Sequence, residues 1–439
     1  MIVTGTHVVT GDPTRPVVTD GAVLVRGGLV AEVGTSSELR TAHPGEPVVD
    51  TGRVVLPGLV NTHTHTYSAY ARGMAVHAPT RDFDEILGNL WWALDRLLEP
   101  EDVRLNATTT FLESVRCGVT TVFDHHSSPN AAPGSLATIA EAARQVGVRA
   151  CLCYETSDRD GPTAFAEAVA ENVGFMHAAN TPDQHRLRGL FGMHASFTLS
   201  EASLDTIAGA AEAVPGGYHV HVAEGPLDQP RTVAATGRRV VDRLAARGMV
   251  GPDSIAAHCV HVTPVETEVL AEHGATVVHN PHSNLSNAVG FAPVVEMLRR
   301  GIRVGLGTDA YTPDVLASMQ VAKIAASGHR LDPTVGFAEA VTMLFEHNPA
   351  IATEVFGRDI GVLRPGAVAD LVTLDYRPPT HLDDRSVWGH VVFGMSGAQV
   401  ADVLVDGEWV LREREFPGLD EAAVLAHSAE RAERIWKEL

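Results

Sequence analysis

The sequence predicts an α/β fold: a (β/α)₈ TIM barrel that carries a small β-sandwich domain built from both chain ends. Eight apolar runs recur through the middle of the chain, most of them separated by segments with a helical pattern. Each run ends in a polar residue, and catalytic side chains of this fold lie at the carboxyl ends of the barrel strands. Short β patterns broken by Gly and Asp occupy both flanks.

The size and net charge of the chain limit the classes of function that it can have. The chain has 439 residues, 45% hydrophobic and 20% charged, which is ordinary for a globular protein. A formal net charge of −21 argues against nucleic acid and membrane surfaces as partners, because both are anionic. We therefore expect a neutral or cationic small molecule as the partner, and we leave a homodimer or higher homo-oligomer open.

Cysteine usage and the absence of targeting signals indicate the compartment. The four cysteines form no CxxC pair, no apolar run is long enough to span a bilayer, and the N-terminus lacks a basic n-region. We expect a cytoplasmic protein.

The flanking patterns are "HVVTGD", "GAVLVRGGLVAEVG", "ADLVTLD" and "VADVLVDGEWVLRERE". Such stretches are typical of hairpins. We expect residues 1–56 and 362–416 to form the β-sandwich domain, residues 57–361 the metal-dependent barrel, and residues 417–439 a C-terminal helix.

The first barrel strand lies in "PGLVNTHTHTYS", residues 57–68. Because alternate residues of a strand share a face, His63 and His65 should point the same way and could bind one metal ion. A pair of solvent-facing loop residues is the alternative that this stretch alone leaves open.

A long insertion follows between Tyr67 and Pro100 and contains "ILGNLWWALDRLL". Its pattern predicts an amphipathic helix. We expect Trp91 and Trp92 to pack in the core rather than to contact substrate, and the insertion to cover part of the barrel rim, because a barrel enzyme must exclude bulk water.

The remaining runs are, in order, "GVTTVFDHHSS", "VRACLCYETSD", "LRGLFGMHASF", "YHVHVAE", "SIAAHCVH", "TVVHNPHSN" and "IRVGLGTDA". Several polar residues at their ends could contact substrate, and a purely structural, hydrogen-bonded role is equally open for each. These candidates are His125 or His126, Glu155, His194, Asn280 and Asn284.

A metal site emerges when His221, after the fifth run, and Asp309, after the eighth, are added to the first two histidines. Three imidazoles and one carboxylate suit Zn²⁺ or Fe²⁺ and leave a position for water. The only lysines, Lys323 and Lys437, rule out a bridging carbamylated lysine. One metal ion is the simpler interpretation, and a second ion bridged by Glu155 is the alternative.

The same strand ends supply an acid and a base. A bound divalent ion lowers the pKa of its water from 15.7 to about 7. Glu224, three residues after His221, could carry the proton, and His258 could polarise the water or steady the developing charge. His219 has no required task, and we interpret it as packing or as support for a ligand.

The motifs "PGLVNTHTH", "HVHVAE", "AAHCVH", "HNPHSNL" and "GLGTDA", in this order, resemble the amidohydrolase superfamily, in its branch of mononuclear deaminases and chlorohydrolases. Within the branch, "NLWWALDRLL", "DHHSSP", "CYETSDR" and "GHVVFGMSG" are similar to SsnA-type aminohydrolases. The resemblance implies metal ligands, a proton shuttle, and a histidine beside the water and substrate. The implied metal ligands are His63, His65, His221 and Asp309. Glu224 would be the proton shuttle, and His258 the histidine beside the water and substrate.

The resemblance also bears on the reaction. Chlorohydrolase members can lack the glutamate and the histidine of the deaminases, whereas this chain has both, and His194 matches a substrate-contacting position of nucleoside and thioether deaminases. His282 departs from many relatives, which leaves ring specificity open there. The H-x-E and P-C-x-x-C motifs of the cytidine-deaminase type are absent.

We therefore expect a hydrolase acting on carbon–nitrogen bonds other than peptide bonds. It would deaminate a purine, pterin, pyrimidine or triazine with hydroxide activated by one Zn²⁺ or Fe²⁺, releasing ammonia. The alternatives are a cyclic amide or amidine hydrolase, a chlorohydrolase and, less favoured, a non-catalytic metal-binding barrel.

Overall fold

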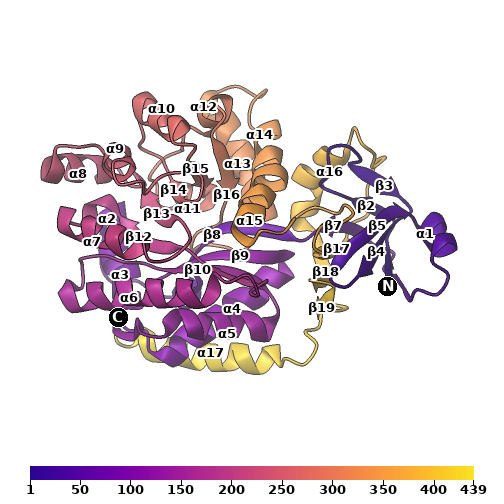
Figure 1. The fold of residues 1–439 in the computed structure, drawn as a ribbon, viewed down its shortest axis with the longest axis horizontal. Coiled ribbons are helices and arrows are strands. Elements are labelled where there is room, and N and C mark those ends of the chain that lie inside the picture. The colour runs from indigo at the N-terminus through magenta and orange to yellow at the C-terminus, as the bar shows by residue number, and fades with distance from the viewer.

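The computed structural model describes residues 1–439 (Figure 1). Eight parallel strands form a barrel, which confirms the predicted fold class. They are β8 (Leu59–Thr64), β9 (Val119–His126), β10 (Arg149–Tyr154), β12 (Phe191–Ala195), β13 (Tyr218–Val222), β14 (Ile255–His258), β15 (Thr276–His279) and β16 (Arg303–Leu306). Parallel bridges between Thr156 and Met193 and between Thr64 and Asp309 join the two arcs of strands and close the barrel.

The fourth apolar run is divided between two strands. Its first part, β11 (Leu187–Gly189), pairs with β10, whereas its second part, β12, pairs with β13. Leu190, between them, stays buried. One continuous apolar run therefore serves both neighbours of the fourth barrel position.

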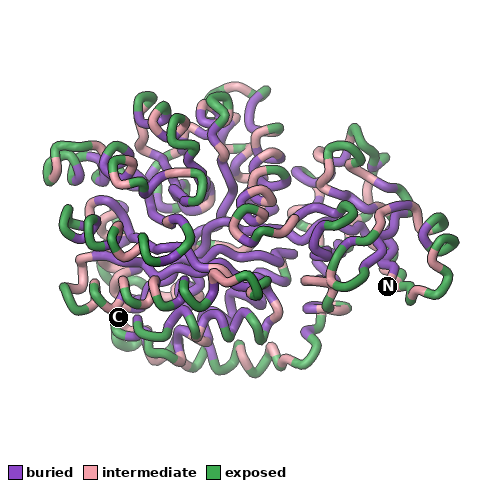
Figure 2. The backbone as a smooth tube through the Cα atoms, viewed as in Figure 1, coloured by how far each residue is buried: buried purple, intermediate pink, exposed green.

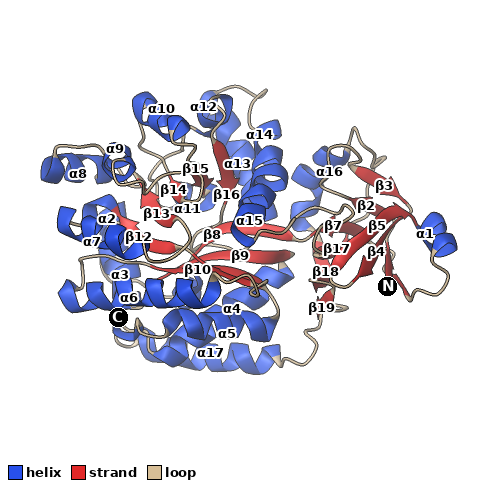
Figure 3. Cartoon of the chain, viewed as in Figure 1, coloured by secondary structure: helices blue, strands red, loops and turns tan.

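Helices surround the strands, and Figure 3 shows them as an outer layer. The strands are buried along nearly their whole length, as near-continuous apolar runs require, whereas green exposed turns mark the outer faces of the helices (Figure 2). The helices are α4 (Pro100–Arg116), α5 (Ser135–Val146), α6 (Gly161–Ala179), α7 (Glu201–Ala211), α8 (Asp228–Thr236), α9 (Val240–Ala245), α10 (Pro264–Glu272), α11 (Pro281–Ser286), α12 (Val294–Arg299), α13 (Val315–Arg330), α14 (Phe337–Thr342) and α15 (Asn348–Phe356). None is long and apolar enough to cross a bilayer.

Two sheets beside the barrel are made from the chain ends. One holds β5 (Leu29–Thr35), β4 (Gly21–Arg26), β1 (Ile2–Thr4) and β6 (Val48–Asp50), in that order, with α1 (Ser36–Ala42) following β5. The other holds β19 (Glu408–Leu411), β18 (Gln399–Val405), β17 (Leu371–Asp375), β7 (Val54–Pro57), β2 (His7–Val9) and β3 (Val17–Thr19). N-terminal β7 pairs antiparallel with C-terminal β17, with Val55 opposite Thr373.

An apolar cluster containing Val3, Val23, Val55, Leu371 and Leu404 draws on both of these sheets. We propose residues 1–56 and 362–416 as one domain on this basis. The sequence pattern did not indicate α16 (Val387–Gly394), which lies within these limits but packs against α13 and α14 of the barrel.

The tail forms α17 (Glu421–Trp436), which packs along α4. Arg431 pairs with the fully buried Asp102 of α4 at 2.7 Å. At the end of the helix, the Trp436 indole N–H donates to the carbonyl oxygen of Tyr70 at 2.8 Å. Because Tyr70 lies in the 3₁₀ turn Thr66–Ala71 directly after the first barrel strand, α17 supports the segment that carries the paired histidines.

A buried cation joins the barrel to the β domain. Arg149 of β10 is fully buried and pairs with Asp370, just before β17, and with Asp406, 3.0 Å away in the turn between β18 and β19. Its position at the amino end of a barrel strand directs the guanidinium away from the carboxyl rim and into the domain interface.

We predict that Arg149→Met lowers the free energy of unfolding by about 3–5 kcal/mol, because it leaves the buried Asp370 carboxylate without its cationic partner. Urea denaturation checks this. Arg144→Met is the control, since Arg144 is half exposed and pairs only with an exposed Glu141, so its effect should stay within about 0.5 kcal/mol. Equal small effects of both substitutions would contradict the role of Arg149.

Candidate metal centre and active site

The carboxyl ends of the barrel strands bring together four side chains that are far apart in the sequence. His63 is the last residue but one of β8, and His65 directly follows that strand. His221 lies near the end of β13, and Asp309 follows β16. The Nε2 atoms of His65 and His221 are 3.2 Å apart, and Asp309 Oδ1 lies 3.0 Å from His65 Nε2 and 3.9 Å from His63 Nε2. All four residues are buried.

The strand ends hold strained backbone. Ala223, His258, Cys259 and Asp309 have φ between 47° and 73°, in the left-handed region that residues other than glycine rarely adopt. Each such residue costs about 1–3 kcal/mol and persists only where the surroundings enforce it. All four lie at the rim that carries the cluster.

Hydrogen bonds on the far side of each ring determine which nitrogen is free. His65 donates its Nδ1–H to the carbonyl oxygen of His125 at 2.5 Å, and His221 donates its Nδ1–H to that of His194 at 2.8 Å. Each neutral ring therefore presents an Nε2 lone pair to the cluster. His63 Nε2 is buried without any hydrogen-bond partner, while its Nδ1 meets His219 Nε2 at 2.8 Å.

Converging lone pairs and a buried carboxylate require a positive charge between them. Burial lowers the pKa of His63 and of His221 well below the usual value, so both rings are neutral, as metal ligands must be. Burial also opposes protonation of His65, but Asp309 outweighs it and raises the pKa of His65 to about 9. A divalent cation would supply this charge to all four groups, so the donor set fits a metal ion.

An acid and a second histidine border the cluster. His258 Nε2 lies 3.5 Å from Glu224 Oε2 and 3.6 Å from Asp309 Oδ2, and its Nδ1–H donates to Asn284 Oδ1 at 2.8 Å. Burial, together with Asp309 and Asp228, raises the pKa of Glu224 well above its usual value, which favours the protonated carboxyl. Asp228 in turn accepts a hydrogen bond from the Glu224 backbone N–H at 2.9 Å.

A small cavity of about 40 Å³ opens directly onto the cluster. Its lining combines chemical groups with aromatic rings: His65, Tyr67, Phe83, Leu87, Trp91, Trp92, Glu155, His194, His221, Glu224, Ser283, Asn287, Asp309, Ala310 and Tyr311. A second cavity of about 240 Å³ shares five of these residues: His65, Trp91, Asp309, Ala310 and Tyr311.

The insertion after the first strand lies over this cavity. It forms a continuous helical segment, α2 (Phe83–Ile86), a π turn (Leu87–Trp91) and α3 (Trp92–Asp95). Trp91 and Trp92 pack against the core as expected, but both also line the cavity, which the sequence pattern did not indicate. The Arg159 guanidinium lies over Trp92 at 5.4 Å and pairs with Asp95.

The residues expected to contact substrate are in two places. His194 and Glu155 line the cavity. His125, His126, Asn280 and Asn284 are fully buried and are not among the lining residues, which favours the structural, hydrogen-bonded role that the sequence left equally open. Asn284 and Asn280 lie against His258, at 2.8 Å and 3.4 Å, and His126 bonds to Ser128 at 2.8 Å, so local hydrogen bonding accounts for these residues.

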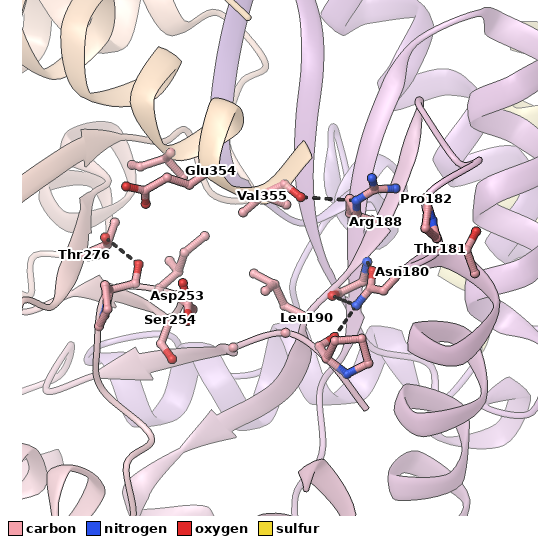
Figure 4. A pocket seen from close by; sticks show the side chains of 17 residues that line it. Asn180, Thr181, Pro182, Arg188, Leu190, Asp253, Ser254, Thr276, Glu354 and Val355 are labelled. Atoms are coloured by element: carbon pink, nitrogen blue, oxygen red, sulfur yellow. Dashed lines mark hydrogen bonds between the residues drawn. The ribbon is translucent and has the colours of Figure 1, made fainter. Parts of the chain in front are cut away.

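The largest cavity is elsewhere. Figure 4 shows this cavity, at the amino ends of the strands and opposite the cluster. Its volume is about 390 Å³, and 4 of its 17 lining residues, Leu190 and Val355 among them, are hydrophobic. Its arginine, Arg188, donates to backbone carbonyl groups, including that of Val355 at 3.2 Å. It holds no group of converging ligands or acids, so the smaller cavity is the candidate site.

The chain is similar to known proteins over nearly its whole length. Residues 54–410 match the amidohydrolase family. The chain is 30% identical to a 5-methylthioadenosine/S-adenosylhomocysteine deaminase of Pelotomaculum thermopropionicum, over 99% of this chain and 98% of the relative.

Two solved structures have the same fold. An adenosine deaminase from Xanthomonas campestris with bound zinc is 26% identical, with a TM-score of 0.85 over 99% of this chain and 98% of that one. The atrazine chlorohydrolase TrzN from Arthrobacter aurescens TC1, complexed with zinc, is 21% identical, with a TM-score of 0.83 over 98% and 99% of the two chains.

We predict that His219→Ala lowers zinc affinity by about 10–100-fold, because His219 fixes the orientation and proton position of His63. Competition against a chelating dye measures this. His219→Gln can keep a hydrogen bond to His63 Nδ1 and should lose less. An unchanged zinc affinity in His219→Ala would reduce His219 to a packing residue.

Proposed function

The chain belongs to the amidohydrolase family, and from this premise we propose that it is a metal-dependent hydrolytic deaminase. It acts on a carbon–nitrogen bond other than a peptide bond. The reaction replaces the exocyclic amine of an aminated N-heterocycle with a hydroxyl group and releases ammonia.

One observation carries the proposal: the lone pairs of His63, His65 and His221 converge with Asp309 directly beside the buried carboxyl of Glu224. We assign the first four residues as ligands of one Zn²⁺ or Fe²⁺. When bound, such an ion acts as a Lewis acid and makes water a competent nucleophile at neutral pH.

Glu224 and His258 provide the proton chemistry. Burial favours the protonated form of Glu224, which can donate to a ring nitrogen of the substrate, and its carboxylate can then take the proton of the attacking water and pass it to the leaving amine. His258, 3.5 Å from Glu224 and held by Asn284, is placed to donate to charge that develops at the attacking oxygen. His194 and Glu155 border the same space and would contact the ring.

The lining favours a flat ring as substrate. Tyr67, Trp91 and Trp92 surround the cavity, and flat aromatic surfaces stack on planar heterocycles. The helical segment above the cavity keeps bulk water from the reacting carbon. The whole chain aligns with a relative named for deamination, which supports the same reaction class here.

Two rival reactions are ring opening of a cyclic amide or amidine and dechlorination. The second is a rival because an atrazine chlorohydrolase has the same fold. A screen of aminated heterocycles for ammonia release, followed by ultraviolet absorbance, separates them. Deamination gives one equivalent of ammonia and an intact ring chromophore. Loss of the chromophore without free ammonia, or activity confined to chlorinated rings, would favour a rival.

We predict one equivalent of tightly bound Zn²⁺ or Fe²⁺ per chain, and loss of metal and activity together in His63→Ala and in Asp309→Ala. Elemental analysis alongside the ammonia assay tests both statements. Two equivalents in an active preparation would contradict the single site. Full metal content in both variants would contradict the ligand assignment.

We predict that Glu224→Gln keeps the fold and the metal but lowers kcat by about 10³-fold, because one group serves both proton transfers and each is worth about 10²–10⁴-fold. The KM should change far less. Glu212→Gln, on the exposed end of α7, is the control. If Glu224→Gln turned over within about tenfold of the parent, the activation barrier would have risen by only about 1.4 kcal/mol. Another group would then have to carry the proton.

A further inference from the structure

Glu155 is a buried acid that faces the cavity without a hydrogen-bonding partner. The residue follows β10, is only 5% exposed and lines the small cavity. Its backbone N–H donates to the His126 carbonyl oxygen at 2.8 Å, but its carboxylate takes part in no hydrogen bond. A buried carboxylate without donors is costly, so its surroundings should show what it is kept for.

Its two imidazole neighbours present lone pairs. His125 Nδ1 lies 3.4 Å from Oε2, but this ring uses its Nε2–H toward the carbonyl oxygens of Met193 and His219, at 3.1 and 3.2 Å. His194 Nε2 lies 3.8 Å from Oε1. With its proton on Nε2, a singly protonated His125 ring presents its Nδ1 lone pair toward the carboxylate.

The proton of His194 is also on its far side. His194 Nδ1 meets Thr198 Oγ1 at 2.8 Å, and that hydroxyl donates to the Ala195 carbonyl oxygen at 3.0 Å. The imidazole must then be the donor in the first contact, which leaves Nε2 as a lone pair toward Glu155.

The nearest cation is engaged elsewhere. Arg159 Nη2 lies 3.9 Å from Oε1, beyond hydrogen-bond distance, and donates to Ser127 at 2.7 Å and to Asp95. Arg159 thus favours the ionised carboxylate without occupying its acceptor sites. The carboxylate remains free to accept from a donor that enters the cavity.

A second metal ion is a weaker occupant than substrate. His65, His125, His221 and Glu155 have ligand atoms within 4.8 Å of one another. However, His65 Nε2 and His221 Nε2 also converge with Asp309 and His63, and one nitrogen lone pair binds one ion. Of these four converging residues, only His125 and Glu155 would then belong to the second ion, fewer protein ligands than metal sites usually have.

The two acids of the cavity belong to different parts of the rim. Glu224, after the fifth barrel strand, lies with His258 and Asp309, whereas Glu155, after the third, lies with His125 and His194. A ring held at the metal ligands between them would meet a proton donor on one side of its amine-bearing carbon and a proton acceptor on the other.

We propose that Glu155 accepts a hydrogen bond from a ring N–H adjacent to the amine-bearing carbon, so that the substrate is a cyclic guanidine. This class has its amine-bearing carbon between a ring N–H and an unprotonated ring nitrogen. The inference rests on the proposed deaminase function and narrows its substrate.

The chemistry balances without a further reactant. Water adds oxygen to the carbon, the bond from carbon to the exocyclic nitrogen breaks, and ammonia leaves with protons carried by Glu224. The ring N–H stays on the substrate throughout, so Glu155 binds and orients the ring and gains or loses no proton.

Isocytosine and cytosine are matched probes, because they are isomers of the same size. The amine-bearing carbon of isocytosine lies between a ring N–H and a ring nitrogen, whereas that of cytosine lies between a ring nitrogen and a C–H. Calorimetric titration of each into the zinc-loaded parent, Glu155→Gln and the control Glu141→Gln measures binding independently of turnover. Glu141 is an exposed residue of α5.

We expect isocytosine to bind the parent and Glu141→Gln at least about tenfold more tightly than cytosine. This ratio is the contribution expected from one hydrogen bond to a charged group. Glu155→Gln should keep its zinc and lose this preference, and Glu155→Asp should keep part of it. Equal binding of the two isomers, binding of neither, or an undiminished preference in Glu155→Gln would overturn the proposal. Loss of a metal equivalent in Glu155→Gln would also overturn it, because Glu155 would then be a ligand.

Ammonia release in the same samples separates the two proposals. A Glu155-dependent preference for isocytosine without ammonia from any aminated heterocycle would leave the recognition standing and remove the deaminase function. Ammonia release with no preference between the isomers would leave the deaminase function standing and remove the proposed recognition by Glu155.

Discussion

The buried convergence of three imidazole lone pairs on the Asp309 carboxylate is the constraint on which the rest of the site depends. None of these groups can be solvated, and the Nε2 atoms of His65 and His221 are only 3.2 Å apart. Such an arrangement is stable only with a positive charge inside it. The closed barrel holds it together, because four different strands supply the ligands and the parallel bridge from Thr64 to Asp309 ties the first strand to the last.

The groups that contact the remote nitrogens of the ligand histidines fix the orientation of these rings. Each ring is oriented by what its remote nitrogen meets: His219 for His63, and backbone carbonyl groups for His65 and His221. Asn280 and Asn284, which the sequence offers either as substrate contacts or as hydrogen-bonded structural residues, lie against His258. Asn284, for example, holds His258 by its Nδ1–H and leaves Nε2 toward Glu224 and Asp309.

Much of the fold and of the metal site can be predicted from the sequence, and the features that cannot be predicted have physical reasons. Strand periodicity and polar strand ends indicate a barrel and place His63, His65, His221 and Asp309 on one rim, because carboxyl ends of parallel strands meet there. Burial is harder to predict. A polar residue at a strand end can point into the cavity, as Glu155 does, or lie behind a ligand, as Asn280 does, and one residue of register or a local turn decides which.

Glu155 and Glu224 show how far environment, rather than residue type, sets chemical roles. Both are buried glutamates on one small cavity. Burial, with Asp309 and Asp228 nearby, raises the pKa of Glu224, whereas for Glu155 nearby positive charge, including the Arg159 guanidinium, outweighs burial and lowers the pKa. One acid is thereby kept as a proton donor and the other as an acceptor. A ring between them must match both, so its pattern of N–H groups and bare nitrogens, more than its size, decides whether it fits.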